Sequence, residues 1–213
     1  MSPQQTIDTF LTHPDEIERL YGWVFENIHP YIKGRTLEIN SGQGSFASLL
    51  IEQNLPVHLS EPDKAIREKL REKFQGYASI KAVHNIDILR TQDFGQIYSS
   101  MTGVFSTILA FNIPEEISSL QQVVENLKLL LRKGGHLIAS IPSQTEIFPG
   151  SNPDLYGLKQ IDQKPILQLL GDFQLLKMRY FTIEKVNTFP MLKQTGLSVL
   201  TIARKNRPII PST

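Results

Sequence analysis

The stretch LEINSGQGSF, residues 37–46, joins a short apolar run to the start of a helix through a turn that holds two glycines. Gly42 and Gly44 can take backbone conformations at positive φ that most residues avoid, so a ligand can approach the chain closely there. A strand, such a turn and a helix N-terminus in succession suit a nucleotide-like cofactor. A plain strand-to-helix turn is the alternative interpretation.

Outward from this turn, strand and helix patterns alternate. Short apolar runs predict strands at 35–39, 57–59, 79–84, 104–111 and 136–141, and helices are expected over 14–28, from Phe46 onward, over 62–76 and over 114–133. This alternation predicts a parallel sheet with helices on both faces.

The last third of the chain has a different pattern. Residues 143–157 have a loop-like composition, a helix is expected over 161–170, and long strands over 173–183 and 197–203 predict an antiparallel edge pair. The expected fold class is therefore α/β, a Rossmann-like, mostly parallel sheet of about seven strands with helices on both faces and an antiparallel pair of edge strands. The expected organisation is an N-terminal helical segment over 1–32 that packs on the core, an α/β domain over 33–205 and a tail over 206–213.

Composition excludes several classes of function. The chain has 213 residues, no cysteine and a formal net charge of +1. Disulfides and thiolate metal sites are excluded, and the five histidines show no metal-ligand spacing. The near-neutral charge gives no general attraction to nucleic acid. Residues 1–10 lack a signal-peptide pattern, and no apolar run approaches the ~20 residues that span a bilayer. We expect a cytoplasmic protein with no membrane, metal or nucleic-acid partner.

Polar residues follow four neighbouring strands. Glu38 ends the first expected strand, and Glu61 ends the second about 20 residues past the glycines, where a carboxylate can accept both hydroxyls of a ribose. A solvated acid before a helix is the alternative for Glu61. Asp87 could accept from an adenine amino group or be a surface acid. Asn112 could face a cofactor or cap the next helix. All four are expected on the carboxyl edge of one sheet, where α/β sheets bind ligands.

In this combination the chain resembles the class I S-adenosylmethionine-dependent methyltransferases over about residues 20 to 205. The stretches that carry the resemblance are the first motif at 37–46, the ribose segment at 59–63, the adenine segment at 85–88, the fourth-strand motif at 105–117 and the entry to the fifth strand at 130–138. The resemblance implies S-adenosylmethionine as cofactor and methyl transfer to a small-molecule acceptor.

The resemblance also implies a set of site residues. Glu38 would lie near the methionine end of the cofactor, Glu61 would hold the ribose, and residues 86–88 would frame the adenine. The expected cofactor-binding residues are Glu38, Asn40, Ser41, Gly42, Gly44, Glu61, Pro62, Ile86, Asp87, Ile88 and Asn112. Candidates for the acceptor site are Tyr21, Tyr156 and Lys159, although Tyr21 and Trp23 could equally be core aromatics of an amphipathic helix. No catalytic residue is assigned.

The sequence departs from the family pattern in four places, one of which is Pro114-Glu115-Glu116 where Leu-Glu-His is more usual. Asn40 stands where the first glycine is usual, although asparagine tolerates the left-handed conformation better than most residues. Ser106 replaces an aspartate common in the fourth strand, and residues 155–160 lack the histidine and arginines of one subgroup.

Two other functions remain open. The first, motivated by Asn40 and 155–160, is a non-catalytic protein that uses the fold to bind a partner. The second is a nicotinamide-dependent oxidoreductase, which is disfavoured because Phe46 and Ala47 stand where the dinucleotide fingerprint has its third glycine. The mixed-charge run over 67–73 is interpreted as a solvated helix face.

Overall fold

The computed structural model describes residues 14–111, 117–143, 168–171, 173–184 and 195–206. Within them a seven-stranded sheet has the strand order β3-β2-β1-β4-β5-β7-β6. The strands are β1 (Thr36–Glu38), β2 (Val57–Ser60), β3 (Ile80–His84), β4 (Phe105–Ala110), β5 (Leu131–Ser143), β6 (Phe173–Glu184) and β7 (Thr195–Lys205). The strands β1 to β5 run parallel to one another, whereas β7 is antiparallel to both β5 and β6. The expected mostly parallel sheet with an antiparallel edge pair is confirmed.

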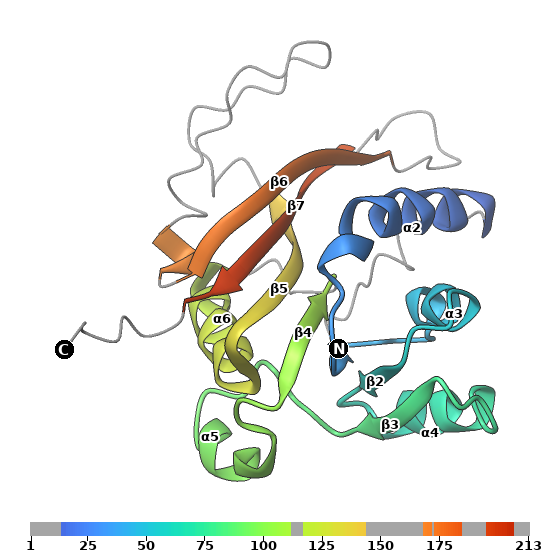
Figure 1. The fold of residues 1–213 in the computed structure, drawn as a ribbon, viewed down its shortest axis with the longest axis horizontal. Coiled ribbons are helices and arrows are strands. Elements are labelled where there is room, and N and C mark those ends of the chain that lie inside the picture. Colours follow the sequence, from blue (N-terminus) through green and yellow to red (C-terminus); the bar gives the residue numbers. More distant parts are fainter. Residues whose placement is uncertain (1–13, 112–116, 144–167, 172, 185–194, 207–213) are drawn as a thin grey trace.

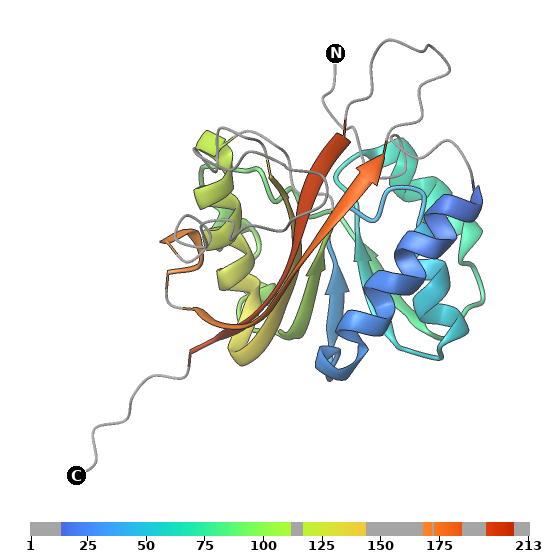
Figure 2. The same ribbon diagram turned by 90° about the horizontal axis from the view of Figure 1, so that it is seen from above.

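Helices cover both faces of this sheet (Figures 1 and 2). One face carries α2 (Pro14–Ile28), α3 (Ser45–Glu52) and α4 (Lys64–Lys73), and the other carries α5 (Phe94–Ile97) and α6 (Ile117–Leu130). Short 3-10 helices follow α2 at His29–Tyr31 and α5 at Ser99–Met101. The four-residue helix α5 was not predicted, because so short an element carries almost no periodic signal.

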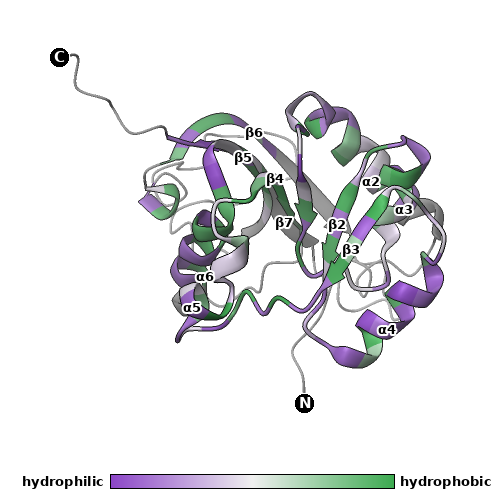
Figure 3. Cartoon of the chain, turned by 60° about the horizontal axis from the view of Figure 1, so that its bottom comes forward, coloured by the Kyte–Doolittle hydropathy of each residue, from purple (hydrophilic) through white to green (hydrophobic). Residues whose placement is uncertain are grey.

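The hydrophobic core lies in two layers because successive side chains of a strand point to opposite faces. In β4, Ile108 packs in the layer under α6, and the next residue, Leu109, packs in the layer with α2 and α3. All six residues of β4 are buried, as expected for a central parallel strand covered on both faces. Figure 3 shows mainly hydrophobic residues on β2, β3 and β4, and many hydrophilic residues on α4, α5 and α6.

The glycine and cap signals place most boundaries correctly. Asp63 caps α4, its Oδ1 accepting from the Ile66 amide over 2.9 Å. Gly134 has a φ of 75°, the left-handed conformation expected after α6, but α6 already ends at Leu130. Leu131 pairs with Phe105 in the sheet, so its expected place on the helix is wrong.

Ser106 lies at the start of β4, far from the carboxyl ends of the strands. Its amide donates to the Arg35 carbonyl over 2.7 Å, and its Oγ faces Gly34, where an added Cβ would lie 2.6 Å from it. The Ser106 departure therefore falls on the amino edge of the sheet. Among the described helices, none is long and apolar enough to cross a membrane.

Candidate functional site

The turn after β1 has the backbone form that the sequence predicts. Asn40, Gly42 and Gly44 have φ values of 52°, 54° and 75°, all in the left-handed region. Asparagine is one of the few residues that take this conformation at low cost. The turn therefore keeps its left-handed form with Asn40 in the place of the usual glycine. Gly44 is the N-cap of α3, so the turn leads directly into a helix N-terminus.

Ser41 and Ser60 join this turn to the end of β2. The Ser41 amide donates to the Ser60 carbonyl over 2.9 Å, and the Ser60 hydroxyl donates to the Glu38 carbonyl over 3.2 Å. Glu38, the last residue of β1, is itself buried. These contacts bring together at the carboxyl edge the residues that the sequence predicts there for the first two strands.

Glu61 fastens the glycine turn to the loop after β2. Its Oε2 accepts from the Gly42 amide over 3.1 Å, and its Oε1 accepts from the Asp63 amide over 3.0 Å. The residue is only 2% exposed, so the interpretation of Glu61 as a solvated acid is wrong. A ligand that reaches this carboxylate must displace some of the chain that covers it.

Burial raises the pKa of the Glu61 carboxyl above its ordinary value. The amides of Asp63 and Gly42 oppose this shift because they stabilise the ionised form. The negative charge of Asp63 raises the pKa further, and the positive charge of Arg67 lowers it. Two backbone donors and one cation therefore favour the carboxylate form against the cost of burial.

Residues 86–88, which follow β3, alternate between core and surface. Ile86 and Ile88 are 0% and 1% exposed in the core layer under α6, whereas Asp87 between them is partly exposed. The two isoleucine side chains are packed in the core, and their place beside an adenine stays a prediction. Asp87 keeps an accessible carboxylate, whose Oδ1 accepts from the Leu89 amide over 3.0 Å.

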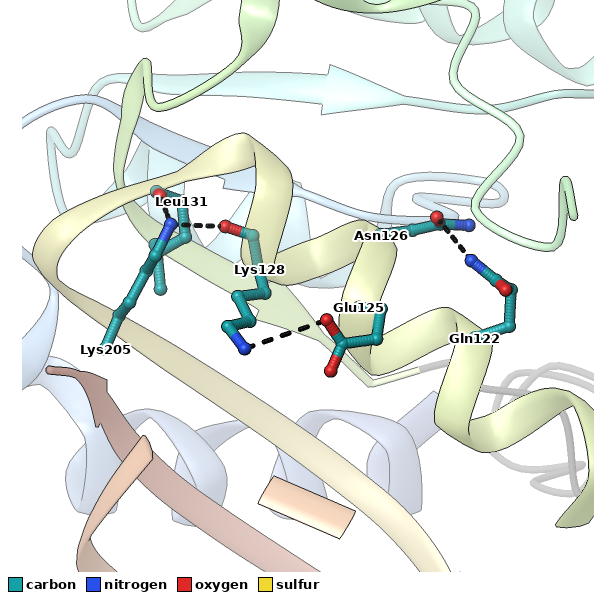
Figure 4. A network of polar contacts seen from close by, with 6 residues as sticks. All are labelled: Gln122, Glu125, Asn126, Lys128, Leu131 and Lys205. Carbon is teal, nitrogen blue, oxygen red and sulfur yellow. Dashed lines mark hydrogen bonds and ion pairs between the residues drawn. The ribbon is translucent and has the colours of Figure 1, made fainter. Parts of the chain in front are cut away.

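Two other elements hold this loop in place. The Tyr98 hydroxyl accepts from the Asp87 amide over 2.9 Å. Asn126 is a buried residue of α6. Its side-chain nitrogen donates to the carbonyls of Ile88 and Arg90 over 2.9 and 2.8 Å. Its side-chain oxygen, Oδ1, accepts from the side-chain nitrogen of Gln122 (Figure 4). The sequence predicted neither anchor, because both link segments that are distant along the chain.

The charged residues of α4 form the solvated face that the sequence predicts, with Arg67 as the exception. Arg67 is 9% exposed and donates to the carbonyls of Glu61 and Pro62. Arg71 donates to the Val83 carbonyl in β3, and Lys73 donates to the Gln43 carbonyl in the glycine turn. Three cations of one helix therefore bind backbone oxygens of the loop after β2, of β3 and of the glycine turn.

Tyr21 packs in the core. Its ring meets Phe46 edge-on with the ring centroids 5.3 Å apart, and Phe46 in turn meets Phe111 at 4.8 Å. Tyr21 is only 6% exposed, as the core interpretation expects, and its place in the acceptor site stays a prediction. Asn112, Tyr156 and Lys159, the other candidates for this end of the site, lie outside the described residues.

Several solved structures have the same fold as this chain. The N-methyltransferase NodS from Bradyrhizobium japonicum matches with a TM-score of 0.58 and 13% identity, covering 91% of this chain and 99% of its own. The CurJ carbon methyltransferase matches at 0.53 and 18%, covering 90% of this chain and 54% of its own. The chain has a class I methyltransferase fold. The (4+2) cyclase SpnF matches at 0.63 and 13% identity, covering 89% of this chain and 80% of its own.

Sequence comparison finds a likeness that covers only part of this chain. No protein-family model matches the chain. The lovastatin diketide synthase lovF of Aspergillus terreus is 25% identical over 125 residues, which is 56% of this chain. This chain covers only 5% of the length of that curated relative.

Proposed function

We propose that this protein binds S-adenosylmethionine at the carboxyl edge of β1, β2 and β3 and transfers its methyl group to a small-molecule acceptor. The observation that carries the proposal is the hydrogen bond from the Gly42 amide to Glu61. It joins a turn of left-handed residues to a buried carboxylate on the neighbouring strand end, within a methyltransferase fold.

The donors and acceptors present at this edge fit such a cofactor. Each oxygen of Glu61 accepts one amide and keeps a further lone pair, so the carboxylate can receive two ribose hydroxyls once the chain that covers it moves aside. Asp87 offers an acceptor for an adenine amino group. Glu38, the last residue of β1, is a buried carboxylate just before the turn and is proposed for the charged methionine end. The Gly42 position lets the chain pass close to the cofactor without a side chain in the way.

The bound cofactor would supply a methyl group made electrophilic by a sulfonium. The task of this chain is then to hold the acceptor in line with that methyl group and to exclude water. A general base is needed only where the acceptor loses a proton early. Tyr156 and Lys159, in the segment after β5, stay proposed acceptor-site residues, and Asn112 stays a proposed cofactor contact.

The names of similar proteins support a small-molecule acceptor. One structure with this fold is described with the conversion of a disulfide into a thioacetal during echinomycin biosynthesis, and the curated relative is named for the lovastatin diketide. The net charge of +1 also gives no general attraction to nucleic acid.

Calorimetric titration of the purified protein with S-adenosylmethionine, S-adenosylhomocysteine and NAD separates the candidate functions. We expect both adenosyl compounds to bind and NAD not to bind. Binding of NAD alone would favour the oxidoreductase instead. Incubation with methyl-labelled cofactor and a metabolite extract then tests catalysis. We expect label in the small-molecule fraction, and label confined to macromolecules would contradict the proposed acceptor class.

One observation favours a second candidate, a protein of this fold that does not transfer methyl groups. SpnF shares the fold and is named as a cyclase, so other chemistry occurs on this scaffold. Tight binding of S-adenosylhomocysteine together with no transfer of label to any fraction would support this alternative.

A further inference from the structure

Arg67 links the loops that follow two different strands. Its side chain runs from the first turn of α4, and one nitrogen, Nη1, has three oxygen neighbours. The distances are 2.7 Å to the Glu61 carbonyl, 2.9 Å to the Pro62 carbonyl and 3.3 Å to Oδ1 of Asn85. The first two oxygens follow β2 and the third follows β3. Arg67 therefore connects the proposed ribose loop to the start of the proposed adenine loop.

The environment of Arg67 differs from that of its helix neighbours. Arg71, one turn later, also donates to a backbone carbonyl but is exposed, and Lys64 and Glu68 form an exposed ion pair. A buried guanidinium costs free energy unless its donors are satisfied and an opposite charge is near. Here three oxygens surround Nη1, and the charge of the Glu61 carboxylate lies within electrostatic reach.

We propose that Arg67 is the positioning residue of the cofactor site, holding the loops after β2 and β3 in the arrangement that receives the adenosine. The inference rests on the proposed function, because it assigns a role toward the same cofactor. Arg67 acts through Glu61 and the two loops and is assigned no contact with the reacting atoms.

The electrostatic part of this role concerns the ionisation of Glu61. The charged groups that act on its carboxyl are Asp63, on the same loop, and Arg67, on α4. The ionisable residues on the adjoining strand ends are Glu38 of β1 and His84 of β3, whose carbonyl accepts from the Glu61 amide. Removal of the Arg67 charge leaves burial and Asp63 to raise the pKa of Glu61 further, and a neutral carboxyl is a poorer acceptor for two ribose hydroxyls.

Two substitutions separate the charge of Arg67 from its hydrogen bonds. Arg67→Met keeps much of the side-chain volume and removes both, whereas Arg67→Lys keeps the charge and loses the planar set of donors. Arg71→Met is the matched control, because it removes a guanidinium that also binds a carbonyl of the same region. Each protein is titrated calorimetrically with S-adenosylhomocysteine from about pH 5 to about pH 9.

We expect Arg67→Met to weaken binding at least about 10-fold and to move the acid limb of the affinity profile to higher pH. Arg67→Lys should restore the position of that limb and only part of the affinity, while Arg71→Met should stay within about 2-fold of the unchanged protein. Equal losses in Arg67→Met and Arg71→Met, or an unmoved acid limb in Arg67→Met, would overturn the proposal.

A measurement without cofactor separates this inference from the proposed function. The Glu61 carboxyl can be titrated by carbon NMR in the cofactor-free protein. We expect a higher pKa in Arg67→Met than in the unchanged chain, and an equal pKa would overturn the electrostatic role.

If Arg67→Met does not fold, Asn85→Ala tests the positioning role, because it removes the β3 end of the link and keeps the guanidinium. We expect about 3-fold weaker binding, and unchanged affinity would overturn the link. If the unchanged chain binds no adenosyl compound, the proposed function fails, while the Glu61 titration still tests the charge of Arg67.

Discussion

The backbone amide of Gly42 donates a hydrogen bond to Oε2 of Glu61 over 3.1 Å, and this bond ties the turn after β1 to the loop after β2. The two residues stand 19 positions apart in the chain and belong to neighbouring parallel strand ends. The same carboxylate accepts from the Asp63 amide, so it organises the N-terminal region of α4 as well. One buried acid thus sets the shape of the proposed ribose site.

Replacing Glu61 by alanine should weaken the binding of S-adenosylhomocysteine by about 1.5–3 kcal/mol, the range for a hydrogen bond to a charged group. This corresponds to a loss of roughly 10- to 150-fold in affinity. Glu61→Gln keeps the shape and one acceptor oxygen, and should lose less. Calorimetry measures both variants, with thermal unfolding as the control for the fold. An unchanged affinity in Glu61→Ala would remove Glu61 from the site.

Asn40→Gly should leave cofactor binding undiminished and change the free energy of unfolding by less than about 1 kcal/mol. Glycine adopts the φ of 52° without strain but adds freedom to the unfolded chain, and the two effects oppose each other. Urea unfolding and calorimetry check the two statements. A large loss of binding would contradict the account, because the asparagine side chain would then itself contact the ligand.

Gly44→Ala should destabilise the protein more than Gly76→Ala does. Both glycines have left-handed φ values, 75° and 87°, so alanine costs roughly 1–2 kcal/mol of backbone strain at either position. At Gly44 the new Cβ would also lie 2.5 Å from Cε2 of the buried Phe74, whereas at Gly76 nothing lies within 4 Å. Overpacking should add about 1–3 kcal/mol to the loss at Gly44, measured by urea unfolding. Equal losses at the two positions would contradict the packing seen at the turn.

Stability should fall as the pH drops from about 6.5 toward 4, and His58 and His84 should cause part of that fall. Their ring nitrogens Nδ1 and Nε2 lie 3.0 Å apart, so one ring must donate and the other accept. Burial, then the charge of His84 and nearby cations, lowers the pKa of His58 to about 4, and burial together with Arg71 lowers the pKa of His84. Both rings are therefore neutral in the folded protein at a pH where the unfolded chain already binds protons.

Replacing His58 by leucine should flatten the dependence of the Tm on pH between about 4 and 6.5, because one of the protons bound on unfolding is lost. Thermal unfolding across this pH range makes the comparison. Parallel curves for His58→Leu and the unchanged protein would contradict this role of the pair.

Asn126→Leu should cost about 1–3 kcal/mol of stability, because it leaves the carbonyls of Ile88 and Arg90 without their donor. Gln122→Ala removes a hydrogen bond to Asn126 but leaves both carbonyls satisfied, so it should cost less than about 1 kcal/mol. Urea unfolding gives both values. Similar losses in the two variants would show that the anchor on the loop after β3 contributes little.

The elements of this fold could be predicted where the local signal is strong. The apolar run and glycines of 37–46 predicted β1, its turn and α3, and the helix start expected at residue 62 lies two residues before the start of α4 at Lys64. The long apolar runs over 173–183 and 197–203 predicted the antiparallel pair. In the structure these two strands are β6 and β7, and each is longer than its predicted range. In each case the deciding residues are neighbours along the chain.

The site was harder to predict because its contacts join distant segments. Arg67 sits in a run of alternating charges whose other members are exposed, so no local pattern distinguishes it. Ile86 and Ile88 were assigned to the site by position along the chain, but strand-like alternation turns them into the core and turns Asp87 outward. Tyr21 carries the same helical spacing whether it packs in the core or closes over a ligand.

A crystal structure of the protein grown with S-adenosylhomocysteine tests the central claim most directly. We expect electron density for the ligand across the carboxyl ends of β1, β2 and β3, with both ribose hydroxyls about 2.5–3.0 Å from the oxygens of Glu61. Ligand density elsewhere on the chain, or none in crystals grown with the ligand in large excess, would contradict it.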